Sequence, residues 1–93
     1  MSAVLSTEDL EGMLKKLPEW ELEGGAIERT FEFEDFNEAM DFVNTVAEVA
    51  EEADHHPDID IRWNKVRLAL VTHSAGGITE ADTEMAQRID RLD

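Results

Sequence analysis

Hydrophobic residues recur along this chain at two different spacings, which divide it into helices and strands. Apolar residues three or four positions apart predict helices over about residues 7–17, 36–53 and 80–92, because that spacing places them on one helical face. Apolar and polar residues alternate over about 20–23, 26–33, 58–63 and 66–73, which predicts strands. The predicted order is α-β-β-α-β-β-α.

Turn and capping residues support these boundaries. Each predicted helix follows a residue suited to an N-cap: Ser6, Asp35 and Thr79. Glu38 and Asp82 lie three residues after two of these caps, which is the spacing of a capping box. Two-residue turns are predicted at Gly24-Gly25 and at Asn64-Lys65. Two hairpins and three helices predict an α+β fold, a four-stranded antiparallel sheet with three helices on one face and a polar, exposed opposite face.

The helix predicted over 36–53 has more apolar positions than one sheet face needs to cover. Its main apolar stripe is predicted to comprise Phe36, Met40, Val43, Ala47 and Ala50. Three further apolar residues widen that stripe: Phe42, Val46 and Val49. Two explanations stay open: the excess contacts another subunit, or it fills a thick core around one central helix.

The length of 93 residues suits one domain, which we expect to span residues 1–93. A domain of this size buries only about 60% of the surface of its unfolded chain, so many such domains depend on disulfides, a metal or oligomerisation. The chain has no cysteine, which excludes disulfides and thiolate metal sites. Oligomerisation is therefore the expected support.

The charge balance is extreme, with 23 acidic residues against 8 basic residues and a net charge of −15. This acidity argues against nucleic-acid binding, which requires a basic surface to neutralise phosphates. No stretch approaches the roughly 20 apolar residues that cross a bilayer, and the first ten residues do not resemble a signal peptide. We therefore expect a cytoplasmic protein without membrane contact.

Dispersed acidic residues with few lysines are typical of proteins that work at high salt, so we hypothesise a halophilic source. Salt screens the repulsion between like charges. The free energy of unfolding, measured by urea titration, is therefore expected to rise with KCl concentration. Equal stability in dilute buffer would contradict the hypothesis.

Three histidines, His55, His56 and His73, are the only ones in the chain. The first two lie at the predicted end of a helix, before Pro57, and the third ends the strand predicted over 66–73. Because the start of one hairpin strand lies beside the end of its partner, all three are expected at one end of the sheet. Further titratable or hydroxyl residues lie near the same end: Glu51, Asp54, Asp58 and Thr72.

General acid–base chemistry suits this cluster, because a histidine with a pKa near 6.5 both donates and accepts protons near neutral pH. Adjacent histidines before a proline do not provide the i, i+4 pair of a helical zinc site, so no metal is expected. A structural role stays open for each histidine taken singly. His55, for example, could interact with the helix C-terminal dipole.

At these residues the sequence resembles the pterin-4a-carbinolamine dehydratase family. The family pattern has an acidic or basic residue, three residues, His-His-Pro, an aromatic residue, a further histidine about ten residues later and a downstream aspartate. Here those places are taken by Glu51, His55, His56, Pro57, Trp63, His73 and Asp82. Some family members have an aromatic residue two positions after His-His-Pro, where this chain has Ile59.

The resemblance implies an enzyme that expels the 4a-hydroxyl of a hydroxytetrahydropterin as water, with the pterin as substrate and no cofactor. It implies that His55, His56 and His73 are the catalytic and pterin-contacting residues. We predict that His56 and His73 transfer protons and that His55 binds the pterin, while the choice of acid and base among them stays open. It places Glu51, Asp54, Thr72 and Ser74 around the substrate, with Glu51 and Asp54 orienting or tuning the histidines. Pro57, Trp63 and Asp82 are given structural or supporting roles. It also implies a homodimer or homotetramer.

Two alternatives accompany this interpretation. The chain could be a non-catalytic pterin-binding or protein-interaction module of the same fold. It could also act on another pterin, such as one in the molybdenum cofactor pathway, and Ile59 leaves room for a different ligand.

Overall fold

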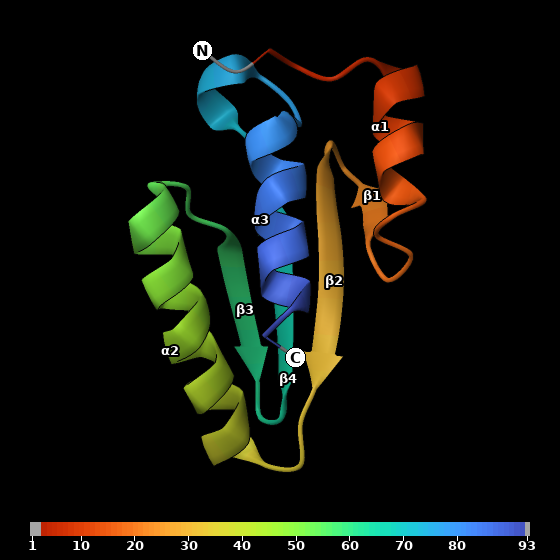
Figure 1. The fold of residues 1–93 in the computed structure, drawn as a ribbon. Coiled ribbons are helices and arrows are strands. Elements are labelled where there is room, and N and C mark those ends of the chain that lie inside the picture. The colour runs from red at the N-terminus through yellow and green to blue at the C-terminus, as the bar shows by residue number, and fades with distance from the viewer. Residues whose placement is uncertain (1–2, 93) are drawn as a thin grey trace.

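The computed structural model describes residues 3–92, which form three α-helices, one short 3-10 helix and four strands (Figure 1). The helices are α1 (Thr7–Leu14), α2 (Phe36–Ala53) and α3 (Glu80–Asp90), and the 3-10 helix is η1 (His73–Ala75). The strands are β1 (Glu21–Glu23), β2 (Ala26–Glu32), β3 (Asp58–Arg62) and β4 (Lys65–Leu70). The predicted order α-β-β-α-β-β-α is confirmed.

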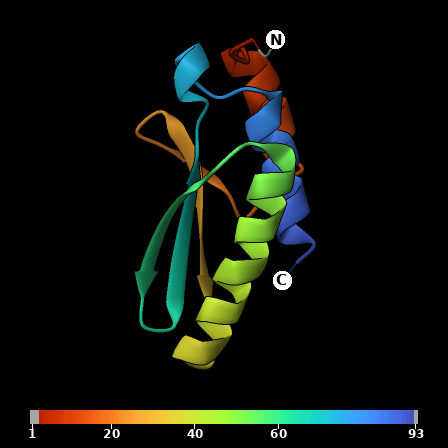
Figure 2. The same ribbon diagram turned by 90° about the vertical axis from the view of Figure 1, so that its left-hand side faces the viewer.

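The four strands form one antiparallel sheet in the order β1-β2-β4-β3. All three helices lie on the same face of this sheet (Figure 2), so the predicted α+β architecture is confirmed. The core lies between the two layers and includes Ile27, Phe31, Val66, Leu68 and Leu70 from the sheet. No helix within residues 3–92 is both long and apolar enough to span a bilayer.

The predicted N-caps begin their helices. The side chains of Ser6 and Asp35 accept hydrogen bonds from the backbone N–H groups of Asp9 and Glu38, at 3.1 and 2.9 Å. The predicted capping box at Asp35 is nevertheless incomplete, because Glu38 accepts its bond from the backbone N–H of Glu34, one residue before the cap. The capping box of α3, described with the site below, is complete.

The structure corrects the predicted core face of α2. The buried stripe is Ala39, Phe42, Val46 and Ala50. Of the stripe predicted as the main one, Phe36 is 48% exposed, Ala47 is exposed, and Met40 and Val43 are half-buried. The two stripes are both apolar and lie side by side on the helix, so their spacing does not show which one faces the core. The prediction chose the wrong one as the main stripe. Packing against the aromatic rings of the sheet decides between them: the Phe42 ring lies 4.7 Å from that of Phe31 and 5.0 Å from that of Phe33.

The turn between β3 and β4 also differs from the prediction by one residue. Arg62 pairs with Lys65, so the turn residues are Trp63 and Asn64. Trp63 has a φ of 51°, a conformation that bulky residues rarely adopt, and it is 68% exposed, which rules out a core position. Asn64 anchors the turn through two hydrogen bonds with the backbone of Phe33, at 2.8 and 2.9 Å.

Arg29 lies in the middle of β2 on the face that meets the helices. Its guanidinium donates to the Asp90 carboxylate at 2.6 Å and lies 4.1 Å from the centre of the Phe31 ring. The indole N–H of Trp20 donates to the same Asp90 oxygen at 2.8 Å. One carboxylate at the end of α3 thus compensates a cation on the core side of the sheet.

The opposite face of the sheet is polar, as predicted. Here Arg67 of β4 donates to the Glu28 carboxylate of β2 at 2.6 Å. That hydrogen bond lowers the pKa of Glu28 and raises the pKa of Arg67.

Arg67→Gln is expected to raise the pKa of Glu28 toward its ordinary value, because the variant removes the hydrogen bond and the cation that favour the carboxylate. A lowered folded-state pKa contributes stability above the unfolded value of about 4.3, and that contribution is lost as pH falls through the folded value. Carbon-13 NMR titration of the Glu28 carboxyl measures the shift. Arg62→Gln is the control and should leave the titration midpoint unchanged; an equal shift in both variants would contradict the assignment to Arg67.

Candidate active site

His55 and His56 follow the C-terminus of α2, where the backbone reverses direction. Asp54 adopts the left-handed conformation with a φ of 51°, which aspartate tolerates better than most residues. The N–H groups of Asp54 and His55 donate to the carbonyls of Glu51 and Ala50, the bonding pattern of a Schellman motif. Buried Pro57 then leads into β3. This reversal carries both histidines from the helix layer to the start of an edge strand.

His73 lies after β4 rather than within it, because the strand ends at Leu70 and His73 begins η1. Asp58 pairs with Ala69, and continuing this register sets His55 and His56 opposite Thr72 and Val71. The residues directly before His73 therefore return to the end of the sheet that holds His55 and His56, while the expected meeting of all three histidine side chains stays a prediction. Within residues 3–92, the exposed His73 ring makes no hydrogen bond.

Asp82 is the centre of a buried polar network at this end of the sheet. Its side chain is fully buried, and its Oδ2 accepts from the Thr79 backbone N–H and the Thr72 hydroxyl, both at 2.8 Å. The Thr79 hydroxyl lies 2.8 Å from the Thr72 oxygen. Because Thr72 uses its one proton on Asp82, Thr79 must be the donor in that contact. The second carboxylate oxygen, Oδ1, lies 2.5 Å from His55 Nε2.

The contact with Asp82 determines which nitrogen of His55 carries a proton. A carboxylate only accepts hydrogen bonds, so Nε2 must be the donor and Nδ1 is the ring nitrogen left for other partners. The His55 side chain is only 16% exposed. Asp82 therefore combines two roles: it completes the capping box of α3 and it orients a histidine 27 residues away.

The other predicted site residues differ in their contacts. Glu51 lies 2.5 Å from His56 Nε2, and both side chains are largely exposed, at 78% and 56%. Asp54 is exposed and ends the helix, and Ser74 is exposed within η1. In the part of the chain that the structure describes, neither makes a side-chain hydrogen bond.

Sequence reasoning assigned the orientation of the histidines to Glu51 and Asp54 and did not find the His55–Asp82 pair. One signal was available: Thr79 and Asp82 form a capping box that starts soon after a strand that returns to the histidines. That topology brings the first turn of α3 toward the end of α2. The side chain that reaches His55 could not be chosen from spacing alone.

Among residues 3–92, no three His, Asp or Glu side chains are arranged so that they could hold a metal ion. His55 and His56 each contact a carboxylate through Nε2, an arrangement that suits proton transfer and hydrogen bonding to a polar ring.

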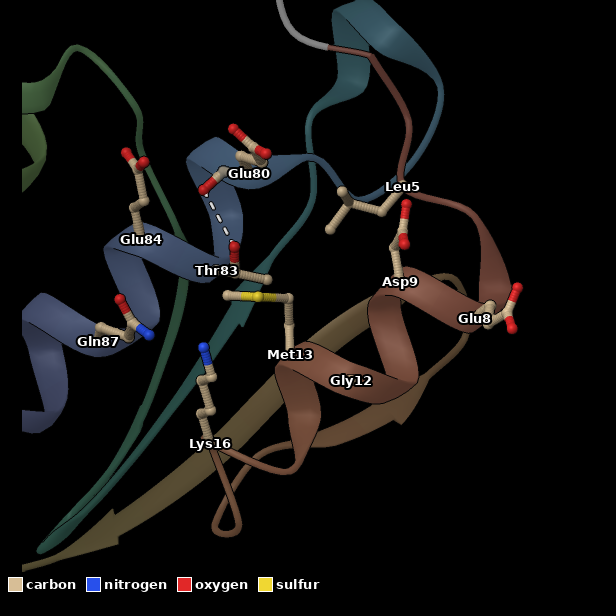
Figure 3. Close-up of a pocket in the computed structure, with 10 residues that line it drawn as sticks. All are labelled: Leu5, Glu8, Asp9, Gly12, Met13, Lys16, Glu80, Thr83, Glu84 and Gln87. Atoms are coloured by element: carbon tan, nitrogen blue, oxygen red, sulfur yellow. Dashed lines mark hydrogen bonds between the residues drawn. The ribbon is translucent and has the colours of Figure 1, made fainter.

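A cavity of about 730 Å³ lies elsewhere, between α1 and α3 (Figure 3). Leu5 and Met13 supply apolar surface, and acidic side chains line both sides: Glu8, Asp9, Glu80 and Glu84. None of the predicted site residues lines it. The candidate active site is thus defined by the histidines and their carboxylate partners and not by this cavity.

The fold and the histidine–carboxylate cluster define a small α+β protein with candidate acid–base groups at one end of its sheet. The sequence profile of the family described as "Pterin 4 alpha carbinolamine dehydratase" matches residues 3–92. The chain belongs to this family.

Curated relatives agree with that assignment. A protein of Acidobacterium capsulatum is 58% identical over 90 residues, covering 97% of this chain and 98% of its own length. One of Mycolicibacterium smegmatis is 54% identical, covering 97% and 96%. Both carry the provisional name pterin-4-alpha-carbinolamine dehydratase.

Solved structures agree on the fold. The crystal structure of a transcriptional coactivator/pterin dehydratase from Brucella melitensis has a TM-score of 0.91 and 36% identity, covering 96% of this chain and 97% of that chain. A pterin dehydratase-like protein identified as a RuBisCO assembly factor in the alpha-carboxysome has a TM-score of 0.64 and 24% identity, covering 78% and 84%. Because the RuBisCO assembly factor is only 24% identical, its similarity shows a shared fold and nothing about function.

Proposed function

We propose that this protein dehydrates a 4a-hydroxytetrahydropterin to the quinonoid dihydropterin. The reaction recycles the pterin of aromatic amino acid hydroxylases. It delivers one proton to the departing hydroxyl, which leaves as water, and removes one proton from the neighbouring ring nitrogen. The observation that carries the proposal is the oriented histidine, His55 held by buried Asp82, beside an intact His-His-Pro motif.

The different exposure of the three histidines suggests a different role for each in the proposed reaction. His55 is mostly buried and its Nε2 is engaged by Asp82, so its free Nδ1 is suited to hold the pterin in one orientation. His56 and His73 are exposed and able to meet the reacting atoms, so they are the proposed proton-transfer residues. Glu51 would orient His56, while Asp54, Thr72 and Ser74 would border the substrate. No cofactor takes part.

The direct test is the dehydration of chemically generated 4a-hydroxytetrahydropterin, followed by ultraviolet absorbance at high KCl. The wild-type protein is expected to accelerate the reaction well beyond the buffer rate. If folded protein gives no acceleration but binds a pterin, the chain is a binding module or serves another pterin. If it gives neither, the proposal fails.

We also propose that the protein is a cytoplasmic homodimer or homotetramer. A second apolar stripe of α2, formed by Phe36, Met40 and Val43, lies beside the buried one. It is incompletely covered in the single chain, with Phe36 48% exposed. On the edge strand β3, Ile59 and Ile61 point to the helix side yet remain 39% and 37% exposed. Burial of such surface stabilises association, at about 25 cal/mol per Å² of apolar area before the costs of association.

Light scattering after size-exclusion chromatography is expected to give a mass of two or four chains. Met40→Glu places a charge in the half-buried second stripe and should lower that mass. Glu48→Gln on the exposed side of the same helix is the control and should leave it unchanged. A monomeric wild-type protein would contradict the proposal.

A further inference from the structure

We propose that the open face of the sheet carries a binding site for a small multivalent anion, such as the phosphate groups of a small molecule. The site is a cavity of about 380 Å³ lined by Thr30, Asp60, Arg62, Lys65 and Arg67. It lies toward the β3–β4 turn, at the end of β3 opposite to His55 and His56. It is therefore separate from the candidate active site, and its test does not depend on the dehydratase proposal.

The strand register brings these side chains together. Thr30, Arg67 and Asp60 form one row across β2, β4 and β3, and Arg62 pairs with Lys65 two residues further along. All five lie on the face opposite to the buried residues Val66 and Leu68. The row and the pair thus present their polar atoms to one shared space.

Arg62 and Lys65 are a like-charge pair placed directly opposite each other. Such pairs destabilise a sheet through the repulsion between their like charges. The chain has 23 acidic and only 8 basic residues, and yet two of its cations face each other at this position, with Arg67 adjacent on the same strand. A bound anion between the two cations would convert this repulsion into attraction.

Several hydrogen-bond donors that line the cavity have no acceptor among residues 3–92. Lys65 is exposed and forms no ion pair or side-chain hydrogen bond there, and the Thr30 hydroxyl makes no hydrogen bond. Arg62 contacts Asp60 through Nε alone, at 3.2 Å, so its two terminal nitrogens are open. Arg67 is paired with Glu28 and contributes mainly charge.

The surrounding charge selects the kind of anion. The carboxylates of Asp60, Glu28 and Glu32 offset part of the positive charge. Glu32 is the residue of β2 directly opposite Lys65 in the strand register. The net charge of −15 repels anions at long range, which disfavours a nucleic acid or an extended acidic surface. A compact ligand with two or more charges, able to accept from Lys65 and Arg62 together, gains most from the geometry.

The experiment is a nitrogen-15 NMR titration with inorganic pyrophosphate, at the lowest KCl concentration at which circular dichroism shows folded protein. Salt screens exposed charges, so a low concentration preserves the signal. Saturable shifts are expected at the amides of Thr30, Lys65 and Arg67. Lys65→Gln and Arg62→Gln are each expected to weaken binding about tenfold, the loss of one charge-assisted hydrogen bond.

Lys15→Gln is the matched control, since it removes the same charge from an exposed residue at the end of α1, on the helix side of the sheet. It should leave pyrophosphate binding unchanged. Two results would overturn the proposal: shifts that do not saturate, or an equal loss of binding in Lys15→Gln and Lys65→Gln, which would indicate a general charge effect.

Discussion

His73→Ala is expected to lower the turnover of 4a-hydroxytetrahydropterin dehydration by about 100-fold, the usual contribution of a general acid or base. The stability of the variant should change by less than about 0.5 kcal/mol, because His73 is exposed and makes no hydrogen bond within residues 3–92. The measurement combines the absorbance assay with urea unfolding of the same preparations. His56→Ala should behave similarly, since its partner Glu51 is itself exposed.

The matched control for His73→Ala is Arg91→Ala, a change at an exposed position near the C-terminal end of α3, away from the histidines. It should retain full turnover. Full activity in both histidine variants would show that proton transfer is assigned to the wrong residues, even if the wild-type protein is a dehydratase.

Asp82→Ala is expected to destabilise the fold by about 3 kcal/mol, a large share of the roughly 5–15 kcal/mol typical of a domain. The variant leaves three buried or half-buried donors without their acceptor: the Thr79 N–H, the Thr72 hydroxyl and His55 Nε2. Buried donors without partners cost about 1–3 kcal/mol each, partly recovered by relaxation. Urea unfolding measures the loss.

Glu38→Ala is the control, because Glu38 occupies the same third helical position in α2 but is exposed. It should cost less than about 1 kcal/mol, as expected for an exposed capping residue. Similar costs at the two positions would show that Asp82 acts only as a helix cap and that the network adds no stability.

Asp82→Asn separates the orienting role from the structural one. If the amide oxygen keeps the position that caps α3 and accepts from Thr72, the NH₂ group, which is a donor, takes the position next to His55. His55 Nε2 must then become the acceptor and the proton must move to Nδ1. Nitrogen-15 shifts of the His55 ring are expected to show this exchange, and turnover should fall at least about tenfold. An unchanged ring tautomer with full activity would exclude an orienting role.

Features that depend on neighbouring residues in the chain could be predicted from the sequence. Ser6, Asp35 and Thr79 cap their helices because the side-chain oxygen meets an N–H two or three residues away. The alternation of apolar residues predicted the strands because successive side chains point to opposite sheet faces. The element order, the α+β architecture and the family followed from these local patterns and from the spacing of the histidine motif.

Choices between nearly equal local options depended on the tertiary structure. Two apolar stripes of α2 compete, and only the shape of the sheet and the ring of Phe31 select the one with Phe42. The β3–β4 turn shifts by one residue because Asn64 binds the backbone of Phe33, 31 residues earlier, which stabilises Trp63 at an unfavourable φ. Neither effect is visible in a short window of sequence.

At the candidate active site, too, some features could be predicted from the sequence and others depended on the tertiary structure. The sequence by itself determined which residues are available: three histidines, their flanking acids and an aspartate at the start of α3. Only the tertiary structure decided that Asp82 rather than Asp54 contacts His55, because that pairing depends on where α3 begins relative to the end of α2. A hydrogen bond requires an approach of about 3 Å, and sequence spacing does not define the distance between two elements 27 residues apart to that precision.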